Sequence, residues 1–459
     1  MTTYDALCAQ AKNGYDCVDG QERIEMEAYC RRYMDFLRVA KTERTTITES
    51  IRLAEEQGFQ PLAPGKPLKA GDRVYLNNRN HSMALAVIGN TPLCDGCSIV
   101  ASHVDSPRLD LKPNPLYEKD EMAFFKTHYY GWIRKYQWFS LPLMLLGTVY
   151  LKNGDAVEIS IGDQPEDPRL VIPDLLPHIS DEQNKLPLNQ AHSGEQCNVL
   201  LGSMPLDDVE SSRAVKVNIL KMLNEKYGMT EEDFVCAELE IIPALPVSEV
   251  GLDRSFIGAY GQDDRVCGYA ALDALLHMST PNKTAVLIFA DKEEVGNNGI
   301  TGMRSSAFDY FLEQLCNVQN CPLSTCYRNS FCFSADVTAA YDPNFADCFD
   351  PTSAARVNHG IAICKYTGFK GKEQASDACA ELMAYARKLF NANGVVWQAN
   401  EMGRQDLGGG GTVALEIANR GIDTLDAGVP VLGMHSPFEI TAKMDCYMSH
   451  KAYKALYEE

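Results

Sequence analysis

Short apolar runs alternate with longer amphipathic segments along much of this chain. Four runs combine an apolar stretch with the length of a strand: residues 98–103, 284–290, 330–336 and 429–434. Such runs are typical of strands buried on both faces of a parallel sheet. Val266 and Ala270 recur at helical spacing after Asp263, residues 376–391 form another amphipathic helix pattern, and residues 436–439 (SPFE) resemble the capped start of a last helix. These patterns predict an α/β fold with a mixed, mainly parallel sheet flanked by helices.

The pattern changes between residues 106 and 246. Three prolines interrupt residues 107–115, an aromatic stretch follows, and glycine turns then separate alternating segments. We predict that residues 106–246 form an inserted, largely β domain. Residues 1–105 and 247–459 would then form one discontinuous α/β domain.

The charge balance excludes some classes of partner. The chain of 459 residues has 62 Asp and Glu against 42 Lys and Arg, a net charge of −20. Nucleic-acid binding needs a basic surface, so we expect no nucleic-acid partner. The same charge argues against a polybasic contact with a membrane, and we find no apolar run long enough to span one.

Cysteine usage suggests a reducing compartment. Sixteen cysteines are scattered along the chain, and residues 1–5 lack the basic-then-apolar pattern of a signal peptide. We therefore expect a cytoplasmic protein with reduced thiols. Cys94 and Cys97 form a lone C-x-x-C pair without the second pair of a structural zinc site, so both are interpreted as buried or loop residues.

Histidine and carboxylate residues stand at the ends of the four apolar runs or just after them. They are His103, Glu294, Asp336 and His435, and Asp263 opens a predicted helix. Sites in open α/β sheets form at the carboxyl ends of strands, and zinc binds imidazole nitrogen and carboxylate oxygen. Two histidines, a bridging carboxylate and two terminal carboxylates would hold a pair of ions. Each residue alone also has an ordinary interpretation as a turn, cap or strand-end residue.

Two neighbouring carboxylates extend this hypothesis. On an extended segment Asp105 points the same way as His103, so it can accept from the second ring nitrogen of that histidine. Adjacent residues on an extended chain point apart, so one of Glu293 and Glu294 could bind metal while the other faces the attacking water. A solvated acidic pair is the plainer alternative.

Five segments resemble the aspartyl aminopeptidase family of metallopeptidases, in its bacterial subgroup. They are residues 101–107 (ASHVDSP), 262–265 (QDDR), 291–296 (DKEEVG), 334–336 (SAD) and 434–436 (MHS). They follow the family order and span most of the chain. The resemblance implies a metalloaminopeptidase with two zinc ions per subunit, and manganese or cobalt also suits such ligands.

The resemblance also implies a role for each matched residue. His103 and Asp336 correspond to terminal ligands of one ion, Glu294 and His435 to those of the other, and Asp263 to the bridge. In the same comparison, Glu293 corresponds to the general base and Asp105 to the residue that orients His103. Asp264 falls where relatives often carry Asn and is not counted as a ligand. Two alternatives remain: a related two-metal deacylase, and a metal-binding scaffold without turnover.

Substrate binding is implied by two further segments. Residues 358–366 resemble the family stretch with a pocket lysine, here Lys365, whose ordinary interpretation is an exposed strand lysine. Residues 404–412 resemble a substrate-binding loop, with Asp406, Gly410 and Thr412 at the matching positions. Peptides are the expected substrates, and the resemblance implies a preference for Asp or Glu as the first residue.

One departure concerns the inserted domain. Many relatives carry a His there that is thought to reach a neighbouring subunit, and Tyr136 falls at that place in this chain. This puts in doubt both the contact between subunits and a strict preference for acidic residues. Relatives form dimers through the inserted domain, which serves dimerisation and as a lid, and the dimers build a homododecamer; we expect the same assembly here.

Overall fold

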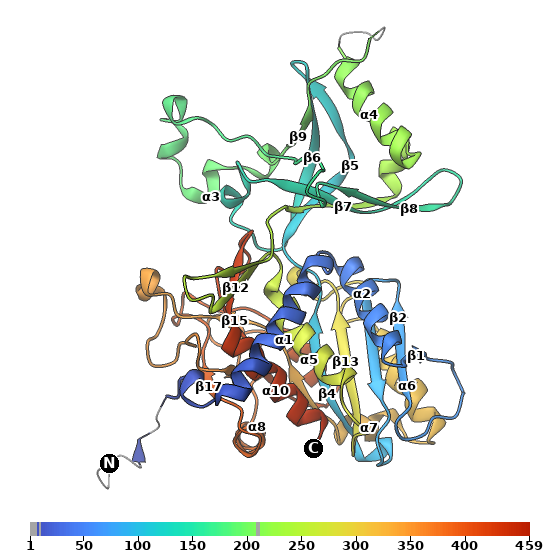
Figure 1. Ribbon diagram of the computed structural model, residues 1–459, viewed down its shortest axis with the longest axis vertical. Coiled ribbons are helices and arrows are strands. Elements are labelled where there is room, and N and C mark those ends of the chain that lie inside the picture. Colours follow the sequence, from blue (N-terminus) through green and yellow to red (C-terminus); the bar gives the residue numbers. More distant parts are fainter. Residues whose placement is uncertain (1–6, 9–10, 208–211) are drawn as a thin grey trace. The chain divides into compact units, whose positions relative to one another are not determined.

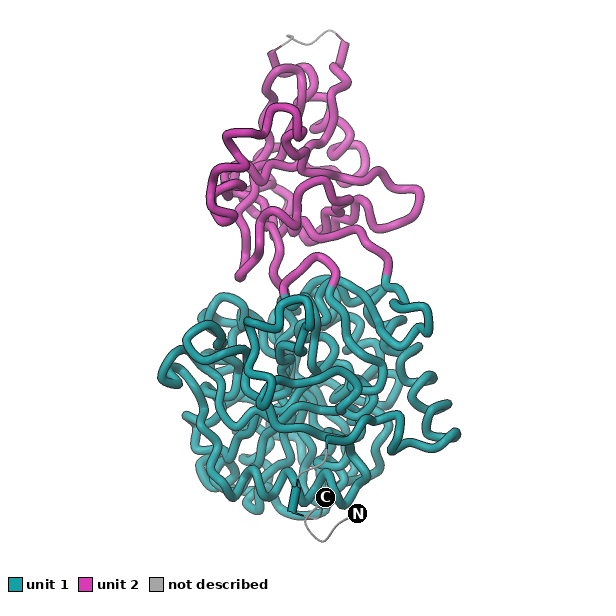
Figure 2. The backbone as a smooth tube through the Cα atoms, turned by 90° about the vertical axis from the view of Figure 1, so that its left-hand side faces the viewer, with its two compact units in different colours: residues 1–105, 247–434, 439–459 teal, residues 106–246, 435–438 magenta. Residues whose placement is uncertain are grey.

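The computed structural model describes residues 7–8, 11–207 and 212–459 (Figure 1). Parts of the predicted domain ranges, namely residues 1–6, 9–10 and 208–211, lie outside the described residues. The chain divides into two compact units (Figure 2). Unit 1 comprises residues 1–105, 247–434 and 439–459, and unit 2 comprises residues 106–246 and 435–438.

A nine-stranded sheet forms the centre of unit 1. In spatial order its strands are β1 (Gln60–Pro61), β2 (Arg73–Asn78), β3 (Ser82–Val87), β13 (Thr284–Ala290), β4 (Cys97–His103), β14 (Phe331–Ser334), β18 (Asp423–Gly428), β16 (Ile361–Cys364) and β17 (Trp397–Asn400). The four central strands β13, β4, β14 and β18 run parallel to one another, whereas β3 and β16 pair antiparallel with this group. The prediction of a mixed, mainly parallel sheet is confirmed.

Helices cover both faces of this sheet, as the apolar strands require. The described helices of unit 1 are α1 (Gly20–Val39), α2 (Glu43–Glu56), α5 (Gln262–Leu276), α6 (Ala307–Val318), α7 (Leu323–Arg328), α8 (Ala380–Ala392), α9 (Ala414–Ala418) and α10 (Lys443–Tyr457). Helices α1, α5 and α10 pack in one buried apolar cluster, and α6 and α7 pack in another. Along β4, Val100 belongs to the first cluster and Ile99 and Ala101 to the second, because successive side chains point to opposite faces.

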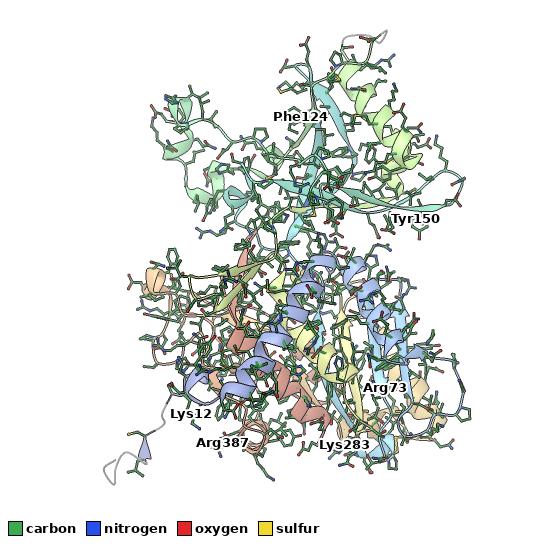
Figure 3. The ribbon with its side chains drawn as sticks, viewed as in Figure 1. Lys12, Arg73, Phe124, Tyr150, Lys283 and Arg387 are labelled. Carbon is green, nitrogen blue, oxygen red and sulfur yellow. A yellow bond between two sulfur atoms is a disulfide. The ribbon has the colours of Figure 1, made fainter. Side chains whose placement is uncertain are left out.

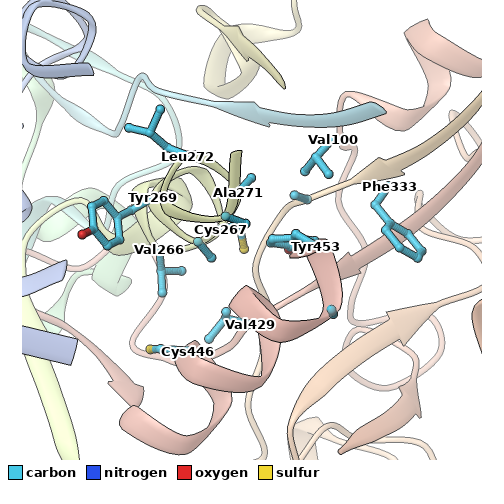
Figure 4. Close-up of a cluster of buried hydrophobic side chains, with 14 of the residues drawn as sticks. Val100, Val266, Cys267, Tyr269, Ala271, Leu272, Phe333, Val429, Cys446 and Tyr453 are labelled. Carbon is cyan, nitrogen blue, oxygen red and sulfur yellow. The ribbon is translucent and has the colours of Figure 1, made fainter. Parts of the chain in front are cut away.

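The first cluster connects the sheet to two of its helices. Val100 of β4 and Phe333 of β14 lie near Cys267 of α5 and Tyr453 of α10 (Figure 4). All four side chains are buried. This packing fixes the start of α5 against the middle of the sheet. Arg73 of β2 (Figure 3) acts at the other end of α5, where its guanidinium donates to the carbonyls of Leu276 and Met278 at 2.9 and 2.6 Å.

A small five-stranded sheet in unit 1 shows that the predicted start of the last helix, at residues 436–439, is wrong. Its strands are β11 (Ser248–Val250), β12 (Phe256–Ala259), β20 (Glu439–Ala442), β19 (Pro430–Leu432) and β15 (Thr338–Ala339). Residues 439–442 pair with β12 and β19, so the last helix begins at Lys443 and not at the SPFE segment. The other amphipathic pattern, residues 376–391, begins its helix only at Ala380.

Unit 2 is built on an antiparallel sheet. Its strand order is β8 (Ala156–Ile161), β7 (Leu143–Tyr150), β10 (Ala237–Pro243), β5 (Arg108–Lys119), β6 (Met122–Tyr130) and β9 (Val199–Gly202). Its described helices are α3 (Leu188–Ala191) and α4 (Ala214–Tyr227). Phe124 of β6 stacks on Tyr117 of β5, with ring centroids 5.5 Å apart (Figure 3).

One pair of cysteines differs from the expectation that the thiols are reduced. Cys94 and Cys321 form a disulfide, with Cα atoms 5.5 Å apart, so the expectation of reduced thiols is wrong for these two residues. Cys97 is buried and its sulfur lies 3.7 Å from that of Cys326. Within the described part of the chain, no helix is both long enough and apolar enough to cross a membrane.

Candidate metal centre

His103 ends strand β4 at the carboxyl edge of the central sheet. Its Nε2 lies 3.1 Å from Asp263 Oδ1 and 3.8 Å from Asp336 Oδ1. Donor atoms of these three residues all lie within 4.8 Å of one another. Asp336 follows β14 by two residues, and β14 is the parallel neighbour of β4, so the sheet itself brings His103 and Asp336 together.

Asp263 reaches this edge from the beginning of α5. Asp263 and Asp264 have non-helical backbone angles and are joined by a cis peptide bond. The backbone N–H of Asp263 donates to Glu439 at 3.0 Å, while Asp264 accepts from the Ser102 hydroxyl at 2.5 Å. The two adjacent carboxylates are therefore engaged differently: that of Asp263 faces His103, and that of Asp264 is bound by Ser102.

A 3₁₀ turn at Glu293–Val295 carries the second pair of carboxylates. Asp105 Oδ1 accepts from the N–H of Glu293 at 3.1 Å, and Oδ2 accepts from that of Glu294 at 3.2 Å. The expected extended conformation at Glu293 and Glu294 is thus wrong. In the turn, Glu294 is buried and Glu293 is half-buried. Carboxylate oxygens of Glu294 and Asp263 lie within 4.8 Å of each other, so Asp263 is near both groups of donors.

Asp105 also contacts the histidine. His103 Nδ1 donates to the Asp105 carbonyl at 3.0 Å, and the Asp105 carboxylate lies 3.4 Å from the same nitrogen. This directs Nε2 of His103 toward Asp263 and Asp336.

Burial and charge together make this edge suited to a cation. Burial lowers the pKa of His103, but the carboxylates of Asp105 and Asp263 raise it well above its usual value. Burial also raises the pKa of the Asp336 carboxyl well above its ordinary range, and nearby carboxylates add to the effect. A metal ion would offset the repulsion between these carboxylates, and imidazole with carboxylate is a donor set that zinc accepts. The residues fit a metal centre.

His435 lies in the loop between β19 and β20. Its Nδ1 donates to the Trp132 carbonyl at 2.9 Å, an arrangement that orients the other ring nitrogen. Four residues later, Glu439 accepts from the N–H of Asp263, as described above. Sequence reasoning missed Glu439, because its segment was interpreted as a helix cap; an acidic residue shortly after a candidate histidine was the available signal. It also missed Ser102.

The predicted substrate residues lie on two other loops of unit 1. Lys365 is half-exposed and its Nζ is 3.5 Å from Asp377. The Thr412 hydroxyl is buried and donates to Asp426 at 2.7 Å. Gly410 accepts from the N–H of Gly368 at 2.6 Å, which joins the two loops. Asp406 is exposed at a positive φ of 68°.

Histidine and carboxylate donors at the carboxyl ends of parallel strands indicate a metal-binding protein of the α/β class. Residues 36–457 match the family described as aminopeptidase I zinc metalloprotease (M18). The chain belongs to this family and is a zinc aminopeptidase. The match favours peptidase chemistry over the deacylase and scaffold alternatives.

Individual relatives agree over nearly the whole length. The probable M18 family aminopeptidase 1 of Thermotoga maritima is 45% identical, over 96% of this chain and 97% of the relative. The protein of the same description from Clostridium acetobutylicum is 42% identical, over 98% of each chain. A solved M18-family aminopeptidase structure from T. maritima superposes with a TM-score of 0.94 at 44% identity, covering 98% of this chain and 100% of that one.

Proposed function

We propose that this enzyme removes the first residue of peptides with two zinc ions bound at the carboxyl edge of the central sheet. His103 and Asp336 would be the terminal ligands of one ion, Glu294 and His435 those of the other, and Asp263 would be the ligand shared by both. The observation that carries the proposal is the position of Asp263, which has donor atoms within 4.8 Å of those of His103 and Asp336 and also of Glu294. Manganese or cobalt would suit the same ligands.

In the proposed reaction, Glu293 transfers the proton of the attacking water, and Asp105 holds Glu293 in position. When bound, the metal pair lowers the pKa of water and polarises the scissile carbonyl. Glu293 acts as the general base: its carboxylate takes a proton from the attacking water and later passes it to the leaving amine. Asp105 fixes Glu293 and Glu294 through their backbone N–H groups and orients His103. Asp105 therefore supports both the base and the ligands.

The direct test compares free and blocked substrates. We expect the enzyme to hydrolyse a peptide with a free α-amine and to leave the N-acetylated form of the same peptide intact, because an aminopeptidase recognises the amine. Product release would be followed by mass spectrometry with zinc, manganese or cobalt added to the apoenzyme. Turnover of the acetylated peptide at a comparable rate would indicate a deacylase or endopeptidase and would contradict the proposal.

Lys365 is proposed as the cation that favours Asp or Glu as the first residue, with Asp406, Gly410 and Thr412 also in substrate binding. Lys365→Ala should lower kcat/KM for Asp or Glu substrates about ten-fold, the value of one hydrogen bond to a charged group, and affect Leu substrates far less. Lys372→Ala is the matched control, because Lys372 also pairs with Asp377, at 2.9 Å. Equal losses on Asp and Leu substrates would remove this role from Lys365.

We further propose a cytoplasmic homododecamer built from dimers, with residues 106–246 as the dimerisation and lid domain. Unit 2 exposes several large apolar side chains, which favours burial in an interface: Trp132, Ile179, Leu186 and Leu188. Light scattering after size-exclusion chromatography would measure the assembly.

A further inference from the structure

A second buried cluster of ionisable residues lies in unit 1. It comprises Glu43 at the first turn of α2, His81 in the turn between β2 and β3, and Asp291 directly after β13. His81 Nδ1 lies 3.3 Å from Glu43 Oε1 and 3.7 Å from Asp291 Oδ2. The three residues are 2%, 8% and 0% exposed. None of them belongs to the proposed metal centre.

Asp291 connects this cluster to the turn that carries Glu293 and Glu294. One carboxylate oxygen of Asp291 accepts from the Lys292 N–H at 2.8 Å, and the other accepts from the Thr301 hydroxyl at 2.5 Å. Asp291 thereby holds both Lys292, the residue just before the turn, and the returning chain at Thr301. Asp105 holds the Glu293 and Glu294 N–H groups, so two buried carboxylates hold the segment.

We infer that Glu43, His81 and Asp291 form a loop anchor, in which the His81 ring lies within ion-pair distance of both carboxylates and thereby positions Glu293 and Glu294 for catalysis. The inference rests on the proposed function of those two glutamates. The anchor joins α2 and the β2–β3 turn to Asp291, which lies two residues before the 3₁₀ turn. A shift of Asp291 would therefore move the base and a ligand together, and displacements of about 1 Å in an active site can cost about a hundred-fold in rate.

A third metal ion is the competing explanation, since these three residues also offer donors within 4.8 Å of one another. Two contacts disfavour it. Asp291 Oδ2, the oxygen nearest His81, already accepts from Thr301 and lies 3.3 Å from Lys292 Nζ. A metal ion on this oxygen would stand beside an ammonium group and be repelled by it.

The test compares His81 variants in the metal-loaded enzyme. His81→Leu should lower kcat about ten-fold or more, with KM changed less than about three-fold, because the proposed substrate-binding residues lie on loops other than this turn. His81→Asn should retain more of kcat than His81→Leu, since its amide nitrogen lies near the position of Nδ1. Glu43→Gln, which keeps the side-chain volume, should also lower kcat.

His450→Leu is the matched control. His450 is another largely buried histidine, with Nδ1 at 3.6 Å from buried Asp273, and its described contacts are with α1, α5 and α10 rather than the turn. It should lower stability while leaving kcat per folded enzyme within about two-fold.

Equal kcat for wild type, His81→Leu and Glu43→Gln would overturn the inference. A third metal equivalent, measured by mass spectrometry and lost only in His81→Leu, would replace it with a metal site. Because all values are relative to the wild-type rate, an inactive wild type would instead contradict the proposed function.

Discussion

Glu293→Gln is expected to reduce kcat about a thousand-fold, within the range that general acid–base catalysis contributes. The amide has the size of the carboxylate but cannot accept the proton from water. The backbone N–H of residue 293 still donates to Asp105, so the turn and the Glu294 position should be unchanged. Steady-state kinetics would measure the loss, and the bound metal should equal that of wild type.

Exposed Glu56, at the end of α2, provides the control. Glu56→Gln makes the same chemical change far along the chain from the turn and should leave kcat unchanged. If Glu293→Gln retained activity within about ten-fold of wild type, another group would have to take the proton.

Asp263→Asn should remove most of the bound metal and abolish hydrolysis. The carboxylate of Asp263 faces His103 Nε2 at 3.1 Å and lies near Glu294, and an amide offers only one neutral oxygen to the two ions. Metal content measured after dialysis should fall from the proposed two equivalents per chain to less than one. Activity should decrease at least about a thousand-fold, because both ions of the proposed site would depend on Asp263.

Asp264→Asn tests which of the adjacent carboxylates is the bridge. Asp264 is bound by the Ser102 hydroxyl, so its amide form should keep the metal even if the fold loses some stability. The reverse outcome, with metal retained in Asp263→Asn and lost in Asp264→Asn, would assign the bridge to Asp264.

The central fold was predictable because its strands are buried on both faces. Residues 99–101 and 285–290 are apolar at every position, and they lie in the neighbouring parallel strands β4 and β13. Their order in the sheet was not predictable, because pairing between segments so distant in sequence leaves no local pattern. Periodicity could not distinguish between adjacent carboxylates. The family resemblance assigned the role of bridging ligand to Asp263 instead of Asp264, and the role of general base to Glu293 instead of Glu294.

Short elements were the places where sequence patterns failed. The SPFE segment looked like a capping box, yet pairing of Glu439–Ala442 with two strands outweighed that local preference. The 3₁₀ turn at Glu293 depends on hydrogen bonds from its backbone N–H groups to the carboxylate of Asp105, a residue almost two hundred positions earlier. The disulfide of Cys94 and Cys321 likewise depends on a long-range approach of two segments. Tertiary contacts decided each of these features.

The position of β4 between β13 and β14 has a consequence for synthesis on the ribosome. About 180 residues separate the end of β4 from the start of β13, including all six strands of the unit 2 sheet. At a translation rate of about 5–20 residues per second, β4 waits roughly 10–40 s for its first partner. During that interval a strand with two apolar faces and two open edges is exposed, and such a segment is a substrate for chaperones and a site of aggregation. Unit 2 interrupts the catalytic chain, and nascent molecules must survive that delay before any metal site can form.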